Sequence, residues 1–420
     1  MHKISTLSNG LRVVSSYMPQ ATSVTIFIFF GCGSRHETKK ENGMAHFIEH
    51  MLFRGTDKRP TSQDICAEIE GLGGFLNGGT DKDFTEYYVK VPADRFATAV
   101  NVLTDMVLRP KFSLQDIAKE KEVIGEEIAM CYDDHQERCE ILIDSILWPN
   151  HSLGRSVAGS IKSINNFNAI QLQTFKDKFY NAGNAVFSVA GNIKHKEVTK
   201  AAKTLLTVLP EGNAPKDKIF KEKNDSQSFI VDKRETEQVH LTLAIPTISR
   251  QNSQRYQLDM LNTILAGGMS GRLFSQLRDN QGLVYTIESY QMRHKESGVL
   301  AIYAATQPSK ACQALASIIN EIKKLAIDGV GEGELHKAKE LVRGRLILKA
   351  ESTKSVAASN GSQLLLNGQI LENDDVLNII EHISAADIQN MAVFLLKQPR
   401  KLAVVGHVSD EKTLQKMLRD

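Results

Sequence analysis

The chain has 420 residues, of which 42% are hydrophobic and 24% are charged, and its 51 basic and 49 acidic residues leave a formal net charge of +2. This composition is typical of a globular enzyme, and the length allows two or three domains. The small net charge gives no reason to expect nucleic acid or an anionic membrane as a partner. No apolar run approaches the roughly 18 residues that a membrane-spanning helix needs.

Two similar series of elements follow one another, about 215 residues apart. Each series is expected to contain two apolar β-rich strands, a long charged helix and a closing strand that ends in glycine. In chain order these are 23–30, 84–91, 113–146 and 185–191, then 239–245, 298–305, 332–366 and 401–406. We therefore predict an α+β fold with two homologous domains, 1–213 and 227–420, joined by a polar linker at 214–226. Each domain should have a mixed, mostly antiparallel sheet packed with helices.

The strongest chemical signal is the motif His46-Phe-Ile-Glu49-His50. Helical spacing places His46 and His50 on one face, where two imidazoles can hold one zinc ion. Glu49 projects to nearly the same face and can act as general base on a water molecule. The order is the inverse of the common H-E-x-x-H motif. Such residues can share a solvated face by chance, but the apolar neighbours here would make an unpaired glutamate costly, which favours a metal.

A third protein ligand is expected on the charged helix that follows. Glu120 and Glu127 are seven residues apart, so they share one face of a helix over 114–130. The neighbouring Glu126 competes with Glu127 for the ligand role, but it points about 100° away around the helix. On spacing alone, a solvated face and a ligand face both remain open for this helix.

These motifs resemble the pitrilysin/insulysin family of inverted zinc metallopeptidases, and most of all its short branch, which includes the mitochondrial processing peptidase β-subunit and its bacterial homologues. In that family a ligand glutamate follows H-x-x-E-H by about 75 residues, with a second glutamate seven residues before it. Here Glu127 is 127 − 50 = 77 residues after His50. The resemblance implies one zinc per chain, held by His46, His50 and Glu127. It also implies that Glu120 orients a ligand or assists proton transfer.

The resemblance also implies residues that contact substrate. The family usually has Asn-Ala where this chain has Asn77-Gly78, and the asparagine is expected to bind substrate backbone. Arg278 and Tyr285 match a family pair that holds the substrate carbonyl and stabilises the oxyanion, although an isolated pair would usually be a surface arginine and a packed tyrosine. Residues 241–293 contain no histidine, so the second domain is expected to be metal-free.

The expected function is that of a zinc-dependent endopeptidase that hydrolyses short or unfolded peptides, with leader and presequence-like peptides as one candidate class. Long family members close four such domains around a chamber, so the resemblance implies a second chain. A homodimer is the simple hypothesis, and a heterodimer with a related subunit is its rival. The alternative function is a non-catalytic scaffold or assembly subunit that retains the metal site.

The start of the chain and the cysteines bear on the expected location. The first residues lead directly into residues 7–14, which are predicted to form a turn and then a strand, with no signal or transit-like segment before it. This favours a bacterial cytoplasm, with the mitochondrial matrix expected only if a presequence has been removed. The five scattered cysteines are typical of a reducing compartment. We expect a peptide substrate as partner, no nucleic acid and no membrane span.

Overall fold

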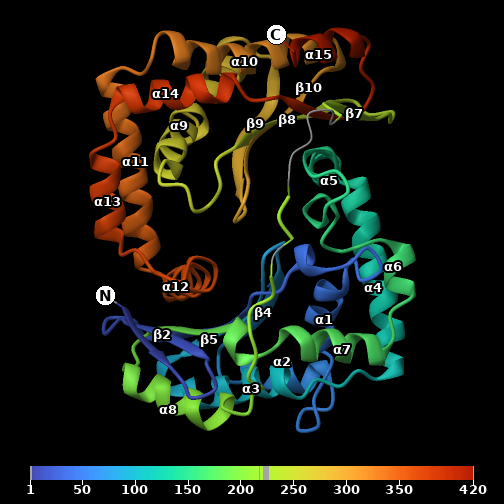
Figure 1. Ribbon diagram of the computed structural model, residues 1–420, viewed down its shortest axis with the longest axis vertical. Coiled ribbons are helices and arrows are strands. Elements are labelled where there is room, and N and C mark those ends of the chain that lie inside the picture. Colours follow the sequence, from blue (N-terminus) through green and yellow to red (C-terminus); the bar gives the residue numbers. More distant parts are fainter. Residues whose placement is uncertain (1, 217, 221–226, 420) are drawn as a thin grey trace. The chain divides into compact units, whose positions relative to one another are not determined.

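Figure 1 shows the computed structural model of the chain, which describes residues 2–216, 218–220 and 227–419. The chain forms two compact units, each built from three segments of sequence. Unit 1 comprises Met1–Ala129, Arg155–Lys218 and Ile347–Glu372, and unit 2 comprises Met130–Gly154, Ile219–Leu346 and Asn373–Asp420. The units are therefore not consecutive halves of the chain. The predicted domain bounds at 213 and 227 stay a prediction, and residues 217 and 221–226 of the predicted linker lie outside the described residues.

The sheet of unit 1 has six strands in the order β1-β2-β6-β3-β5-β4. Their bounds are β1 His2–Thr6, β2 Arg12–Tyr17, β3 Ser23–Phe30, β4 Phe75–Thr80, β5 Thr85–Pro92 and β6 Ala185–Gly191. Every pair is antiparallel except β2 with β6. The apolar run of β3 is buried from Val24 to Phe30 because it lies inside the sheet and is covered on both faces.

Helices cover both faces of this sheet. They are α1 Met44–Leu52, α2 Ser62–Glu70, α3 Phe96–Leu108, α4 Leu114–Asp133, α6 Ile161–Asn165, α7 Ala169–Phe179, α8 His195–Leu206 and α12 Thr353–Asn367. Alternation along β3 sends Ile26 and Ile28 into the core shared with α1, α3, α7 and α8. It sends Phe27 and Phe29 to the other face, where Ala357 of α12 packs against them. Short 3₁₀ turns, η1 Ser34–His36, η2 Ala93–Arg95 and η4 Ala182–Asn184, join these elements.

The sheet of unit 2 has five strands in the order β7-β11-β8-β10-β9, with only β7 and β11 parallel. The strands are β7 Phe229–Asp232, β8 Val239–Thr247, β9 Val284–Arg293, β10 Gly298–Thr306 and β11 Lys401–Val405. The helices are α5 His135–Leu147, α9 Arg255–Ala266, α10 Ala311–Ile327, α11 Glu332–Ala350, α13 Asn373–Glu381, α14 Ala385–Leu396 and α15 Glu411–Met417. The short elements are η3 Ser152–Gly154, the π-helical η5 Phe274–Asn280 and η6 Pro308–Lys310.

One helix in each unit comes from the half of the chain that builds the other sheet. Helix α5 belongs to the first half, yet its residues Leu142 and Ile143 pack against Val299 and Ala403 of the unit 2 sheet. Helix α12 belongs to the second half, yet it lies on β3 and β6 of unit 1 (Figure 1). Each sheet thus has several helices of its own on one face and a single exchanged helix on the other.

The α+β class and the repeat are confirmed by the strand order. The series β6-β3-β5-β4 in unit 1 has the same connectivity as β11-β8-β10-β9 in unit 2. The two long helices predicted at 113–146 and 332–366 are wrong in one respect, because each is two helices. Asp134 caps the start of α5 by accepting the Glu137 N–H, and Ser352 caps α12 in the same way.

Among the described residues, no single helix has the length and apolarity needed to cross a membrane. The pair α13 and α14 meets that test only when taken together, and the two helices are bent by 89° at the break between them.

Candidate metal centre and active site

The start of α1 is held by a buried carboxylate and by a glycine. Gly43 has a φ of 94°, and a Cβ there would lie 2.7 Å from the Ala158 carbonyl oxygen, so no other residue fits without strain. The Gly43 and Ala45 N–H groups both donate to the Glu37 carboxylate at 2.8 Å. These bonds satisfy donors that a helix N-terminus leaves free. Burial raises the pKa of Glu37 to about 7, although these hydrogen bonds oppose the rise.

The apolar residues of α1 determine which way the motif faces. Phe47, Ile48 and Met51 have no exposed surface and lie in the core of unit 1. Helical geometry then places His46 and His50 together on the opposite face, with their ring centroids 4.6 Å apart.

The structure brings His46, His50 and Glu127 together. The Nε2 atoms of the two histidines lie 3.7 and 3.5 Å from the Glu127 Oε2 on α4. Atoms that bind one tetrahedral zinc at bonds of about 2.0–2.2 Å are about 3.3–3.6 Å apart, so the set fits a zinc ion. Within the described part of the chain, no other group of three or more His, Cys, Asp or Glu residues has this arrangement. Burial, and then the neighbouring His50, lower the pKa of His46 to about 4, so its imidazole is in the neutral, metal-binding form.

Glu120 connects the cluster to an arginine. Its side chain is fully buried, and its Oε2 lies 2.9 Å from the His50 Nδ1. Its Oε1 pairs with the guanidinium of Arg54, which lies two residues after the end of α1. A partner at Nδ1 fixes the tautomer and orientation that present the His50 Nε2 to a metal. The sequence left open whether this face of α4 is solvated or holds ligands, and the burial of Glu120 shows that it is not simply a solvated face. Glu126, the competitor of Glu127, is exposed and lies outside the cluster.

Glu49 lies under the edge strand β4. The Thr80 hydroxyl donates to its Oε2 at 3.1 Å, and a Cβ added to Gly78 would lie 3.0 Å from its Oε1. The glycine therefore leaves the space that this carboxylate occupies. Burial raises the pKa of Glu49, while the charge of His50 and the Thr80 hydrogen bond oppose the rise. A carboxylate with a raised pKa beside a metal-binding cluster has the properties of a general base.

The expected substrate residues are divided between the two units. Asn77 is exposed on β4, and its Oδ1 accepts the Gly78 N–H at 2.8 Å. Arg278 and Tyr285 lie together in unit 2, with the guanidinium 5.5 Å from the tyrosine ring centroid and the tyrosine 68% exposed. An exposed phenol beside an arginine can stabilise a negative oxygen. Their role toward a substrate held at the metal cluster stays a prediction.

Sequence reasoning missed three residues that hold the site. Arg54 and Thr80 belong to stretches that resemble the family, Phe53-Arg54-Gly55-Thr56 and the run ending in Gly79-Thr80, but spacing alone assigned them no role. Glu37 gave no local signal, because it acts as a cap from six residues before Gly43. Each of these residues positions another group of the site by a hydrogen bond or ion pair, and none belongs to a recognisable catalytic motif.

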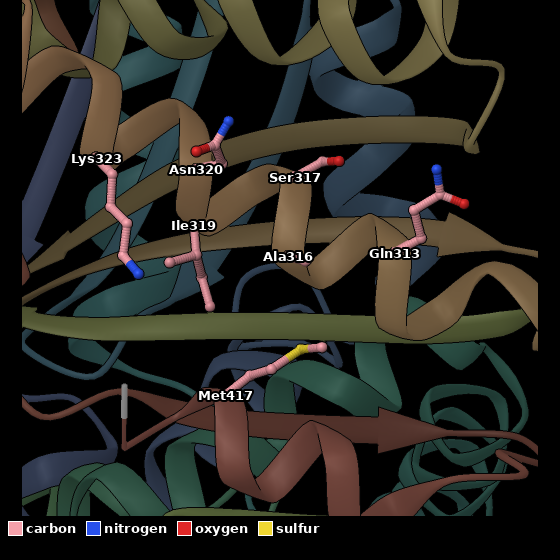
Figure 2. Close-up of a pocket in the computed structure, with 7 residues that line it drawn as sticks. All are labelled: Gln313, Ala316, Ser317, Ile319, Asn320, Lys323 and Met417. Atoms are coloured by element: carbon pink, nitrogen blue, oxygen red, sulfur yellow. The ribbon is translucent and has the colours of Figure 1, made fainter.

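Unit 2 has an open groove of about 420 Å³ between α10 and α15, which Figure 2 shows. It is lined by Gln313, Ala316, Ser317, Ile319, Asn320, Lys323 and Met417. Among the lining residues that the structure describes, Lys323 is the one charged side chain, and no carboxylate or histidine accompanies it. The groove therefore offers no acid–base pair, and we place the candidate active site at the metal cluster of unit 1.

The repeated α+β fold and the inverted histidine–glutamate motif define a class of metal-dependent peptidase-like proteins. The family pattern described as "Insulinase (Peptidase family M16)" matches residues 12–160, and that of the "Peptidase M16 inactive domain" matches residues 166–342. The chain belongs to the M16 peptidase family. The branch that resembles the mitochondrial processing peptidase β-subunit stays a prediction.

Curated relatives match over nearly their whole length. The uncharacterized zinc protease YmxG of Bacillus subtilis is 33% identical over 97% of this chain and 98% of its own. An uncharacterized zinc protease of Rickettsia bellii is 34% identical over 96% and 97%. Two solved structures share the fold at low identity. One is the peptidase M16 inactive domain from Pseudomonas fluorescens, with a TM-score of 0.89 at 20% identity over 96% of this chain and 98% of that one. The other is a protease from Helicobacter pylori, with a TM-score of 0.87 at 21% identity over 96% and 99%.

Proposed function

We propose that this protein is a zinc-dependent endopeptidase that hydrolyses short or unfolded peptides. The observation that carries the proposal is the convergence of His46, His50 and Glu127 on one point, with the Glu49 carboxylate on the same helix as the histidines. The names of the curated relatives as zinc proteases support the same activity. A purely structural metal site needs ligands and no base, so the presence of Glu49 argues against the scaffold alternative.

The proposed mechanism assigns a separate task to each side chain. His46, His50 and Glu127 would hold one zinc ion, which when bound supplies a Lewis acid that lowers the pKa of water toward neutrality. Glu49 takes a proton from the attacking water and returns it to the leaving amine. Thr80 holds the Glu49 carboxylate in place by donating a hydrogen bond from its hydroxyl group.

The edge strand β4 is the proposed binding surface for the peptide backbone. Within the described residues it pairs with β5 alone, so its other edge has no strand partner there and can accept a further strand. An extended peptide can add to such an edge through main-chain hydrogen bonds. A peptide paired with β4 at Gly78 would lie close to Glu49, because Gly78 has no side chain between the strand and the carboxylate. An extended strand of this kind requires an unfolded substrate, which is why we propose peptides and not folded proteins.

A second chain is part of the proposal on family resemblance. The simple form is a homodimer, and a heterodimer with a related subunit is the rival. A bacterial cytoplasmic location is also proposed, again on the family resemblance. Size-exclusion chromatography with light scattering distinguishes the oligomers. A monomer with full activity would contradict both.

The decisive experiment compares cleavage of a library of unstructured peptides by wild type and by Glu49→Gln, with zinc content measured on the same samples. We expect Glu49→Gln to keep one zinc per chain and to lose about 10²–10⁴-fold in cleavage rate. Glu126→Gln is the matched control, because this exposed carboxylate lies beside Glu127 but outside the cluster. Removal of zinc by a chelator should abolish cleavage, and added zinc should restore it. A zinc-loaded wild type that cleaves no peptide would contradict the proposal and favour the scaffold alternative.

A further inference from the structure

Beside the open edge of β4 lies a carboxylate that the proposed mechanism does not use. Glu86 is on β5, directly across from Gly79 in the β4–β5 register. Because Gly79 has no side chain, nothing from β4 stands between Glu86 and the edge. A Cβ built on Gly79 would lie 3.9 Å from the Glu86 Cγ and 4.0 Å from its Oε1. The carboxylate therefore reaches over Gly79 toward the place where an added strand would lie.

The face of the sheet on which Glu86 lies follows from its neighbours along β5. Tyr87 is buried in the core on the α1 side, and Tyr88 packs on the α12 side. Side chains alternate along a strand, so Glu86 shares the α12 face with Tyr88. Residues directly opposite one another in a sheet point to the same face. A peptide residue paired with Gly79 would thus project its side chain onto the α12 face, beside Glu86.

Glu86 is a carboxylate with no partner among the residues described. Its carboxylate has no hydrogen bond or ion pair with any residue that the structure describes. Lys354 of α12 is the cation that faces it, but the Lys354 Nζ donates to the Tyr88 hydroxyl at 2.7 Å and lies 4.3 Å from that ring's centroid. Burial raises the pKa of Glu86 to about 7, with Lys354 opposing the rise and Asp81 and Glu49 adding to it. A half-buried carboxylate without a counter-ion gains from a cation that arrives with a ligand.

The distances suit a long basic side chain. An added strand lies about 4.8 Å from β4, and its Cβ atom opposite Gly79 would be about 5 Å from the Cβ position at Gly79. The stems of lysine and arginine are long enough to cross that gap and reach the Glu86 oxygens. A short or acidic side chain would leave Glu86 unpaired or would repel it.

We propose that Glu86 is a specificity-determining residue that selects lysine or arginine at the peptide position paired with Gly79. This inference rests on the proposed peptidase function and on peptide addition at β4. Because Gly78 is the residue next to Glu49, the selected position lies within about two residues of the scissile bond. The substrates are therefore expected to be peptides with a basic residue within about two residues of the cleaved bond.

The test uses a set of unstructured peptides that differ only in having lysine, glutamine or glutamate at successive positions around one cleaved bond. For wild type we expect kcat/KM to favour lysine over glutamate by about tenfold at one position only. Glu86→Gln should reduce that ratio to about twofold, and Glu86→Lys should reverse it. Glu122→Gln is the matched control, since it removes an exposed carboxylate two residues from Glu120, on the far side of α4, and should leave the ratio unchanged.

A binding measurement separates this inference from the proposed function. The affinity of the same peptides is measured by fluorescence anisotropy for Glu49→Gln and for Glu49→Gln combined with Glu86→Gln. A lysine preference that depends on Glu86 in these variants supports the inference even if wild type proves inactive. Cleavage with equal rates for lysine and glutamate at every position overturns the inference and leaves the peptidase in place. Binding of none of the peptides overturns both.

Discussion

Arg54→Gln gives a sharp test of how the metal cluster is held. The Glu120 side chain is 1% exposed and the Arg54 side chain is 29% exposed, and Arg54 is the one cation paired with Glu120 within the described residues. Removing one member of a buried ion pair costs about 3–5 kcal/mol, because the other charge is left buried without a partner. Solvent reaches part of Arg54, so we expect a loss of about 2–3 kcal/mol in the free energy of unfolding.

The same substitution should weaken metal binding. Without Arg54, the His50 Nδ1 is the one partner left to Glu120 in the described part of the chain, so the carboxylate is less firmly held. Loss of a residue that orients a ligand typically costs about 10–100-fold in metal affinity. Urea unfolding measures the first quantity, and competition with a chromophoric chelator measures the second without reference to activity. In both measurements Arg54→Lys should fall between wild type and Arg54→Gln, because lysine keeps the charge but lacks the guanidinium fork.

The control is Arg109→Gln. Arg109 is 52% exposed and lies 3.6 Å from the Asp105 carboxylate, so its loss should cost less than about 1 kcal/mol and leave zinc affinity unchanged. If Arg54→Gln unfolds within about 0.5 kcal/mol of wild type and binds zinc as tightly, the account of Glu120 as a carboxylate held by Arg54 is refuted.

Two further predictions concern single hydrogen-bonded groups. Thr80→Val removes the hydrogen-bond donor to Glu49 and should lower kcat about tenfold. Zinc affinity should not change, since the Thr80 hydroxyl bonds to Glu49 and not to a metal ligand. An unchanged kcat would show that Glu49 does not need this hydrogen bond. Burial, and then the charge of His135, lower the pKa of His240 in the folded state to about 4, below its usual value near 6.5. The neutral imidazole therefore contributes fully to the free energy of unfolding above pH 6.5, and this contribution is lost as the pH falls toward 4. Because His240 is partly exposed, wild type should lose only about 1–2 kcal/mol more than His240→Gln over this range in urea unfolding, and parallel pH profiles would contradict this.

Local patterns predicted the inner strands β3, β5 and β6 of one sheet and β8, β10 and β11 of the other, but they missed the edge strands β4 and β9 and the helix ends. The short run of β-branched and aromatic residues in β3 is typical of a buried strand, and its position matches the prediction at 23–30. The break at Asp134 was missed because the charged, amphipathic pattern continues from α4 into α5 without a change in period. A signal was present nonetheless, since Asp134 followed by Glu137 is an N-cap pattern.

Some residues of the site could be predicted from the sequence and others could not. His46, Glu49 and His50 were predictable because one turn of helix brings them together. Glu127 is 77 residues from His50, so only the family resemblance could pair them. Arg54 could not be assigned, because its role depends on a contact with Glu120 that exists only in the folded chain. The face that α5 covers was equally out of reach, since periodicity reveals an apolar stripe but not which sheet it meets.

The exchange of α5 and α12 means that the chain passes between the two units five times, at 129/130, 154/155, 218/219, 346/347 and 372/373. Cutting it within 214–226 would give two fragments, each with one sheet face stripped of its helix. Such fragments should aggregate when expressed alone and should be rescued by co-expression. The same topology is what a domain-swapped homodimer of a single repeat would acquire on gene fusion.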